Sequence, residues 1–156
     1  MKKLLKLLIA ALPVLPISAS PDFSGTWNIE YSPSGTVSTT GDSFKLVLIQ
    51  EGRTICGFHY GTARGTAKID WGWADDKKPT VYGQINSSGT ATVTLHSSHS
   101  ETPIKAKIAI SEGHLVWLAD RALGDLPSTI PESATLASIK PKSAELRDLK
   151  SCSEGY

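Results

Sequence analysis

The chain has 156 residues, of which 40% are hydrophobic, 20% are charged and 7% are aromatic. This composition is typical of a globular protein, excludes a disordered, collagen-like or membrane-embedded chain, and fits a single domain. The formal net charge is +1, but three lysines lie among the first six residues, and without them 13 basic residues face 15 acidic ones. Such a chain lacks the basic stripe that binding to a phosphate backbone requires, so we expect no nucleic-acid partner.

The first 19 residues have the pattern of a secretory signal peptide. The three lysines give a basic start, residues 7–17 form an apolar run, and the small residues Ser18 and Ala19 follow. This run is shorter than the roughly twenty residues that a membrane-spanning helix needs. We therefore predict cleavage after Ala19, a mature domain of residues 20–156, no stable membrane span, and export to the periplasm or the extracellular medium. An N-terminal amphipathic helix is the alternative.

The mature chain is predicted to be an all-β barrel. From Phe23 onward, β-branched and aromatic residues recur in short runs that clusters of Gly, Ser, Asn and Asp separate. Because short turn sequences with glycine connect successive runs, at 51–53, 86–89 and 111–113, hairpins follow one another without a long crossover. This favours a single up-and-down antiparallel barrel of about eight strands over a two-sheet sandwich. The predicted strands are residues 24–31, 43–50, 54–61, 65–73, 80–86, 90–97, 103–110 and 114–120.

Alternation within these runs predicts which face is buried. In the seventh run, the apolar side chains of 104, 106, 108 and 110 alternate with Lys105 and Lys107. In the first run, Trp27, Ile29 and Tyr31 share one face. Glycines within strands predict bulges, bends or close backbone approach, and they are Gly57, Gly61, Gly65, Gly72 and Gly83.

The C-terminal tail, residues 121–156, is predicted to lie as a strap over the barrel. It contains one weak β-like run at 134–139, an additional edge strand in this interpretation, and residues 143–150 fit a short helix. The two cysteines, Cys56 and Cys152, are predicted to form a disulfide, because an exported chain meets an oxidising compartment. Two free thiols are the alternative.

The first strand begins with Phe23-Ser24-Gly25-Thr26-Trp27. This segment resembles the Gly-x-Trp motif of the calycin-type barrels, the lipocalins and avidins. The resemblance implies a structural role for Gly25 and for Trp27, which would pack across the closed end of the barrel. The later lipocalin motifs and the polar residues of avidins are not found here, so neither retinoid nor biotin binding carries over.

Four aromatic residues are candidates for ligand binding. Trp71 and Trp73 flank Gly72 on one face of the fourth predicted strand, and the charged turn 75–79 follows them. Apolar rings beside carboxylates at a barrel mouth can hold an apolar or aromatic small molecule, and Tyr60 and Tyr82 are expected nearby. Packing of the tryptophans in the lumen is the alternative.

Catalytic and metal motifs are not found in the sequence. His96 and His99 would face opposite sides of an extended strand, and the four histidines have no zinc-ligand spacing. There is no nucleophile elbow, phosphate-binding loop or HExxH pair. Asp75 and Asp76 lie beside two lysines in a predicted solvated turn, although a pair of catalytic carboxylates brought together by the fold stays open. We predict a non-enzymatic protein with no metal and no cofactor.

Two functions of different classes follow. The first is an exported binding protein, expected to be a monomer, that holds a small apolar ligand at the barrel mouth with the four aromatics. The second is a periplasmic inhibitor or immunity-type protein that blocks a partner enzyme or toxin with its loops. The residues expected to contact that partner are Ser34, Gly35, Thr36, Asp75 and Asp76. Lumen occupancy distinguishes the two: small inward side chains leave a cavity, and large ones fill the barrel.

Overall fold

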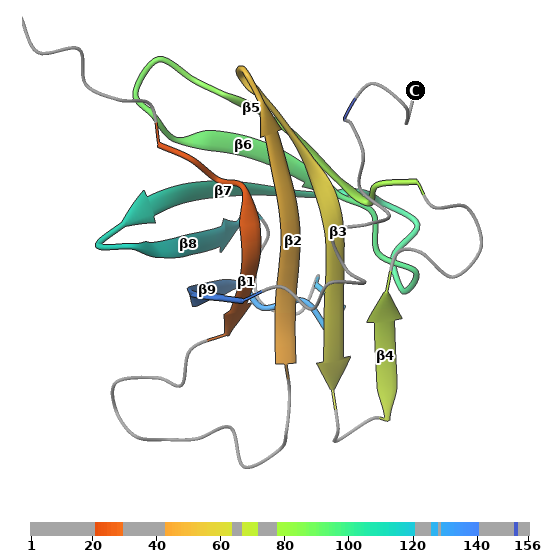
Figure 1. The fold of residues 1–156 in the computed structure, drawn as a ribbon. Helices are drawn as coiled ribbons and strands as arrows, with labels where there is room; N and C mark the ends of the chain where they lie inside the picture. The colour runs from red at the N-terminus through yellow and green to blue at the C-terminus, as the bar shows by residue number, and fades with distance from the viewer. Residues whose placement is uncertain are drawn as a thin grey trace, which may run out of the picture.

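The computed structural model describes residues 21–29, 43–63, 67–71, 78–120, 126–127, 129–140 and 152. Within these ranges the secondary structure is almost entirely β (Figure 1). No helix in the described ranges is long and apolar enough to cross a membrane. The strands are β1 (Gly25–Ile29), β2 (Ser43–Glu51), β3 (Thr54–Ala63), β4 (Lys68–Trp71), β5 (Val81–Ile85), β6 (Ala91–Leu95), β7 (Ile104–Ser111), β8 (His114–Ala119) and β9 (Ser133–Ile139).

Eight of these strands form a closed antiparallel barrel. The sheet order is β2-β1-β9-β8-β7-β6-β5-β3-β4, and the additional pairing of β2 with β3 closes the ring. Neighbours in the barrel also follow one another along the chain, apart from the excursion to β4, so the predicted up-and-down barrel is confirmed. A closed eight-stranded barrel of this kind is compatible with a calycin-like fold.

The prediction misplaced two strands. The fourth predicted strand, 65–73, is not a barrel strand: β4 covers only Lys68–Trp71 and pairs with the second half of β3. The run at 134–139, predicted as an edge strand, is β9, which completes the barrel between β8 and β1. The cause is the length of β3, whose first half pairs with β5 and whose second half pairs with β4. The helix predicted at 143–150 lies outside the described residues.

The predicted turns close the hairpins, and their glycines adopt left-handed backbone conformations. Gly52 has a φ of 62° and Gly89 a φ of 80°, while Glu112 and Gly113 have φ of 51° and 79°. Two successive residues with positive φ match the right-handed twist of the strands they join. We call the side of the barrel that carries the turns 51–53, 86–89 and 111–113 the hairpin end, and the opposite side the loop end.

Apolar residues close the hairpin end. Phe23 is fully buried, its N–H donates to Gln50 Oε1 (2.9 Å), and its carbonyl accepts a hydrogen bond from Trp27 Nε1 (2.9 Å). Trp27 itself is 5% exposed and belongs to the main core. Arg53 ties two hairpins together because its guanidinium donates twice to the Ile85 carbonyl.

Large apolar side chains fill the barrel interior. The alternation predicted in β7 is present, with Ile104, Ala106 and Ile108 buried between the exposed Lys105 and Lys107. Phe44 and Trp117 meet edge to face with ring centroids 5.1 Å apart. The largest fully buried side chains are Trp117, Phe23, Phe44, Leu46, Leu48, Ile55, Leu95, Ile104, Ile108, Leu115, Leu136 and His59.

Candidate functional site

The loop end is closed by a buried polar network centred on Asp70. This residue lies on β4, faces inward opposite Gly61, and is fully buried. Its carboxylate accepts hydrogen bonds from the Ser97 hydroxyl, from the Ser98 N–H and hydroxyl (both 2.9 Å), and from the Thr129 hydroxyl (3.2 Å). One carboxylate therefore joins β4 to the connection after β6 and to the connection before β9.

A buried imidazole extends this network to β3 and β5. His59 Nε2 lies 3.2 Å from Asp70 Oδ1, and both side chains are fully buried. Nε2 has no aligned hydrogen-bond acceptor, so this is a close polar contact rather than a well-directed hydrogen bond. On the other side of the ring, Nδ1 shares a hydrogen bond with the Thr80 hydroxyl (2.8 Å), which also accepts from the His59 N–H (3.2 Å).

The network determines the protonation of Asp70. Burial alone would raise the pKa of this carboxyl, but contact with His59, the hydrogen bonds from Ser97 and Ser98, and the His59 charge together outweigh burial. They hold the pKa of Asp70 well below its ordinary value of 3.8. The carboxylate therefore stays ionised inside the barrel.

Hydroxyl, imidazole and carboxylate in one line have the composition of a nucleophilic triad, but this arrangement supports a structural role. His59 and Asp70 have no solvent-exposed surface, and Thr80 is 9% exposed. The hydroxyl that would act as nucleophile is therefore nearly inaccessible to a substrate, and the imidazole is not aligned with the carboxylate that would have to orient it.

Glycine lets the connecting segment approach this network. A Cβ built on Gly61, the neighbour of Asp70 across β3 and β4, would lie 2.2 Å from the Thr129 carbonyl oxygen. Close backbone approach, predicted for the strand glycines, is the role of this residue. The sequence motif His96-Ser97-Ser98-His99 belongs to the same region, where the two serines bind Asp70 and His99 Nε2 donates to the Ile69 carbonyl (3.0 Å).

The aromatic candidates lie on the outer face of the barrel. Tyr60 pairs with Trp71 across β3 and β4, their rings meet edge to face at 6.4 Å, and Lys45 Nζ lies 4.1 Å from the Tyr60 ring centroid. Trp71 is 53% exposed and Ile69, on the same face of β4, is 59% exposed. Lumen packing is therefore wrong for Trp71. Tyr82 lies apart from this pair, on β5.

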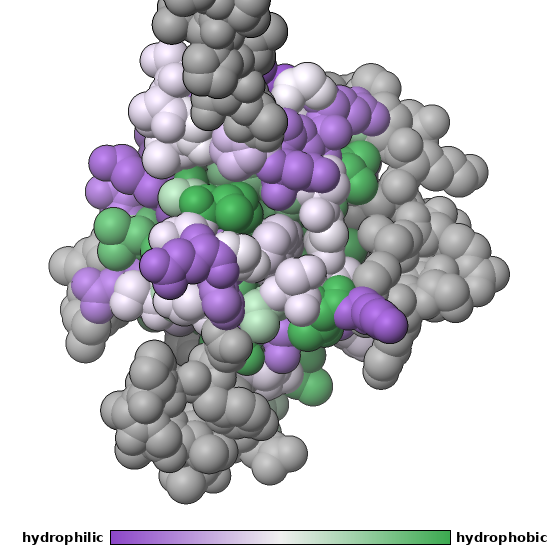
Figure 2. Space-filling model, turned by 60° about the vertical axis from the view of Figure 1, so that its left-hand side comes forward, coloured by the Kyte–Doolittle hydropathy of each residue, from purple (hydrophilic) through white to green (hydrophobic). Residues whose placement is uncertain are grey.

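Few large apolar side chains are exposed elsewhere on the described barrel. The others are Val116, Leu118 and Ile139, on β8 and β9. Figure 2 shows small apolar areas on one face of the molecule, separated by hydrophilic and near-neutral side chains. Ile69 and Trp71 on β4, together with the Tyr60 ring, therefore form a more compact exposed apolar surface than the side chains on β8 and β9.

A disulfide attaches the end of the chain to this outer face. Cys56 and Cys152 are bonded, with Cα atoms 5.5 Å apart, so the predicted bridge is present and is consistent with an exported protein. The two cysteines form a small outer core with Val47 and Phe58. Ile49, Tyr60 and Tyr82 pack against this outer core.

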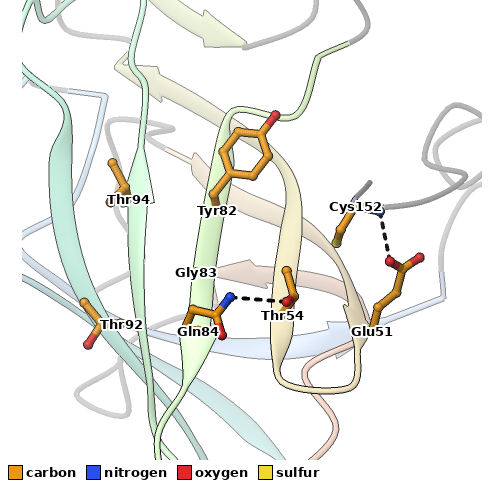
Figure 3. A pocket seen from close by; sticks show the side chains of 8 residues that line it. All are labelled: Glu51, Thr54, Tyr82, Gly83, Gln84, Thr92, Thr94 and Cys152. Carbon is orange, nitrogen blue, oxygen red and sulfur yellow. Dashed lines mark hydrogen bonds between the residues drawn. The ribbon is translucent and has the colours of Figure 1, made fainter. Parts of the chain in front are cut away.

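A groove lies on the outer face beside the disulfide (Figure 3). Its volume is about 720 Å³. Cys152 forms part of one side, where its N–H donates to Glu51 Oε2 (3.3 Å), and Gln84 Nε2 donates to the Thr54 hydroxyl (3.2 Å) across the strands. The groove is lined by Glu51, Thr54, Tyr82, Gly83, Gln84, Thr92, Thr94 and Cys152.

The remaining candidates lie outside the described residues: Trp73 and the loop positions Ser34, Gly35, Thr36, Asp75 and Asp76. The structure thus unites Tyr60 with Trp71 and places Tyr82 in the groove. Sequence analysis missed the Asp70 network, because its members are spread from 59 to 129 without a motif. The only signal was Asp70 within a strand, an unusual position for a carboxylate unless it is paired.

No family model, no curated protein and no solved structure matches this chain. The function must therefore be argued from the barrel and its surfaces.

Proposed function

We propose that this chain is an exported, non-enzymatic binding protein that recognises a partner protein on the outside of its barrel, as an inhibitor or immunity-type protein does. The observation that carries the proposal is the filled interior: inward positions hold Trp117, Phe44 and several leucines and isoleucines, all fully buried. Large inward side chains are what we expect of a barrel that recognises its partner with its surface and not with its lumen.

The exposed pair on β4 supports a recognition surface at the loop end. Trp71 and Ile69 flank Asp70, whose side chain is fixed by hydrogen bonds from two other segments. Exposed aromatic side chains on a rigid strand lose little conformational entropy on binding, and tryptophan is enriched among the residues that dominate interface energies. The loop residues 34–36 and 75–76 are proposed to extend this surface.

Export to the periplasm or the extracellular medium belongs to the proposal. The N-terminal segment has the pattern of a signal peptide. A disulfide that links residues 96 positions apart fits an oxidising compartment. Descent from the calycin-type barrels is supported by the Phe23–Trp27 segment together with the closed eight-stranded barrel.

A small apolar ligand at the barrel mouth has less support. Phe23 and Trp27 close the hairpin end, and the Asp70 network closes the loop end with polar groups. The aromatics chosen for this role, Tyr60, Trp71 and Tyr82, lie on the outer face.

The test is native mass spectrometry of the mature protein, purified gently from its own exported fraction. A retained mass of protein size supports the proposal and identifies the partner. A retained mass of a few hundred daltons, or a bare monomer together with no capture of any protein from the source organism, contradicts it. Trp71→Ala should weaken the complex at least about tenfold, the loss expected for an interface anchor.

The matched control is Leu118→Ala. Leu118 is 51% exposed, close to the 53% of Trp71, but it lies on β8 rather than on β4. Equal effects of the two substitutions would argue against a surface centred on Trp71. Deletion of residues 34–40 should also weaken the complex while the barrel stays folded.

A further inference from the structure

We propose that the groove beside the disulfide binds a neutral, hydroxyl-rich ligand of the saccharide class, and that Cys152 supplies one side of this site only while it is bonded to Cys56. The groove is separate from the Trp71 surface in sequence and in lining residues, so this inference does not depend on a protein partner. It rests on the size, the chemistry and the covalent construction of the groove.

The size and position of the groove suit a short sugar chain. Its volume of about 720 Å³ lies within the roughly 300–1,000 Å³ typical of small-molecule sites. It lies on the outer face of β3, β5 and β6, where the side chains of Tyr82 and Gln84 alternate along β5 with the inward-facing Gly83 (Figure 3).

The lining chemistry selects against other ligand classes. The side chains of Thr54, Thr92 and Thr94 contribute hydroxyls, and Gln84 contributes an amide. Among the described lining residues, Glu51 is the only charged one, and its carboxylate disfavours anionic ligands. The only large apolar surface that the described lining residues offer is the Tyr82 ring, which is too little to retain an apolar ligand without help from hydrogen bonds. A saccharide matches because it presents many hydroxyls and also a C–H face that packs on an aromatic ring.

Tyr82 is held in place to act as that ring. Its register partners are Cys56 on β3 and Thr94 on β6, and it packs against the outer core of Val47, Cys56, Phe58 and Cys152. The ring is therefore supported from beneath by a core that includes the disulfide. The matched residue Tyr60 packs against the same core but does not line the groove.

The disulfide makes the site conditional on oxidation. Cys152 is 96 residues from Cys56 in sequence and reaches the groove through the S–S bond, with the N–H bond to Glu51 as a second attachment. Reduction by dithiothreitol yields two thiols on the protein and the cyclic disulfide of the reagent. Among the described residues, a part-buried hydrogen bond to Glu51 and packing on the outer core are then the contacts of Cys152, and we expect them to be too weak to keep that side of the groove in position.

The experiment uses the oxidised mature chain, uniformly labelled with nitrogen-15, and titrates it with maltotriose, cellotriose and the trimer of N-acetylglucosamine. We expect at least one of these neutral trisaccharides to shift the backbone amide signals of Tyr82, Thr94 and Cys152. The trimer of galacturonic acid, which is anionic, should bind at least about tenfold more weakly. Binding of none of the neutral sugars, or signals shifted only outside the groove, would overturn the proposal.

Variants locate the site and separate it from the proposed function. Tyr82→Ala should weaken sugar binding about tenfold or more, whereas Tyr60→Ala and Trp71→Ala should leave it unchanged. If Tyr82→Ala does not fold, Thr92→Val, at an exposed position in the groove, is the second variant and should weaken binding severalfold. Equal losses in the Tyr82 and Tyr60 variants would contradict the assignment of the site.

Reduction tests whether sugar binding requires the disulfide. In dithiothreitol, with the fold verified by near-UV circular dichroism, sugar affinity should fall at least about tenfold. Unchanged affinity in the reduced, folded chain would remove Cys152 from the site. If reduction unfolds the barrel, the shift of the Cys152 amide signal in the oxidised titration decides the question, because a side of the groove that touches the sugar must respond.

Discussion

The two ends of the barrel are closed by different chemistry. At the hairpin end, Phe23 and Trp27 cover the core, and their polar atoms pair with neutral groups: the Trp27 indole with the Phe23 carbonyl, and the Phe23 N–H with the Gln50 side chain. At the loop end, a buried ionised carboxylate collects donors from positions 27, 28 and 59 residues away. An apolar closure weakens gradually as area is lost, whereas a charged closure fails when one partner is removed.

This difference is relevant to function because Trp71 lies beside Asp70 on β4. Among the described strands β4 pairs only with β3, so the Asp70 network, together with the His99–Ile69 hydrogen bond, attaches it to the rest of the loop end. The exposed surface proposed for recognition is therefore supported by the more fragile of the two closures.

Removal of the Asp70 carboxylate should have the largest effect on stability. Asp70→Ala should lower the free energy of unfolding by about 3 to 5 kcal/mol, because it leaves His59 and several hydroxyls buried without their partner. Equilibrium urea unfolding followed by tryptophan fluorescence measures the loss. A loss below about 1 kcal/mol would show that the loop end tolerates the change as an apolar closure would.

Adding one methyl group tests the close approach at the loop end. Gly61→Ala should lower the free energy of unfolding by about 3 kcal/mol, since its Cβ would lie 2.2 Å from a backbone oxygen that no side-chain rotation can move. Gly52→Ala is the control at the hairpin end. It meets no atom within 4 Å and should cost about 1 kcal/mol, from its positive φ alone. Urea unfolding of the two variants side by side should preserve this order.

At the hairpin end, Trp27→Phe tests a neutral closure. The substitution removes the indole N–H that donates to the Phe23 carbonyl and leaves a small cavity, so the free energy of unfolding should fall by about 2 kcal/mol. The unfolding transition should stay cooperative, with an unchanged dependence on urea concentration. A loss as large as that of Asp70→Ala would remove the distinction between the ends.

The hairpin end was predictable from sequence and the loop end was not. The segment Phe23–Trp27, the glycine turns and the alternation in β7 are local patterns, and each was found where it was expected. The Asp70 network joins residues from five separate segments, and no regular spacing of these residues along the chain predicts it. The same reason explains why the sequence predicted β4 as a barrel strand and β9 as an edge strand. Both positions depend on the pairing of β3 with β4 and with β5, and those contacts are distant in sequence.

Acid should weaken the loop end of the natural chain more than the hairpin end. The pKa of Asp70 is held below its ordinary value of 3.8, so below that pH the unfolded chain binds a proton that the folded chain does not. The stability that Asp70 contributes is therefore fully present above pH 3.8 and is lost as pH falls through the folded pKa, by up to about 1.4 kcal/mol per pH unit. Urea unfolding at pH 5, 4 and 3 should show this slope in the natural chain and a reduced slope in Asp70→Asn, with the exposed Asp120→Asn as control. Parallel profiles for the natural chain and Asp70→Asn would mean that the folded protein does not hold the carboxylate ionised, and the charged closure would then lose its basis.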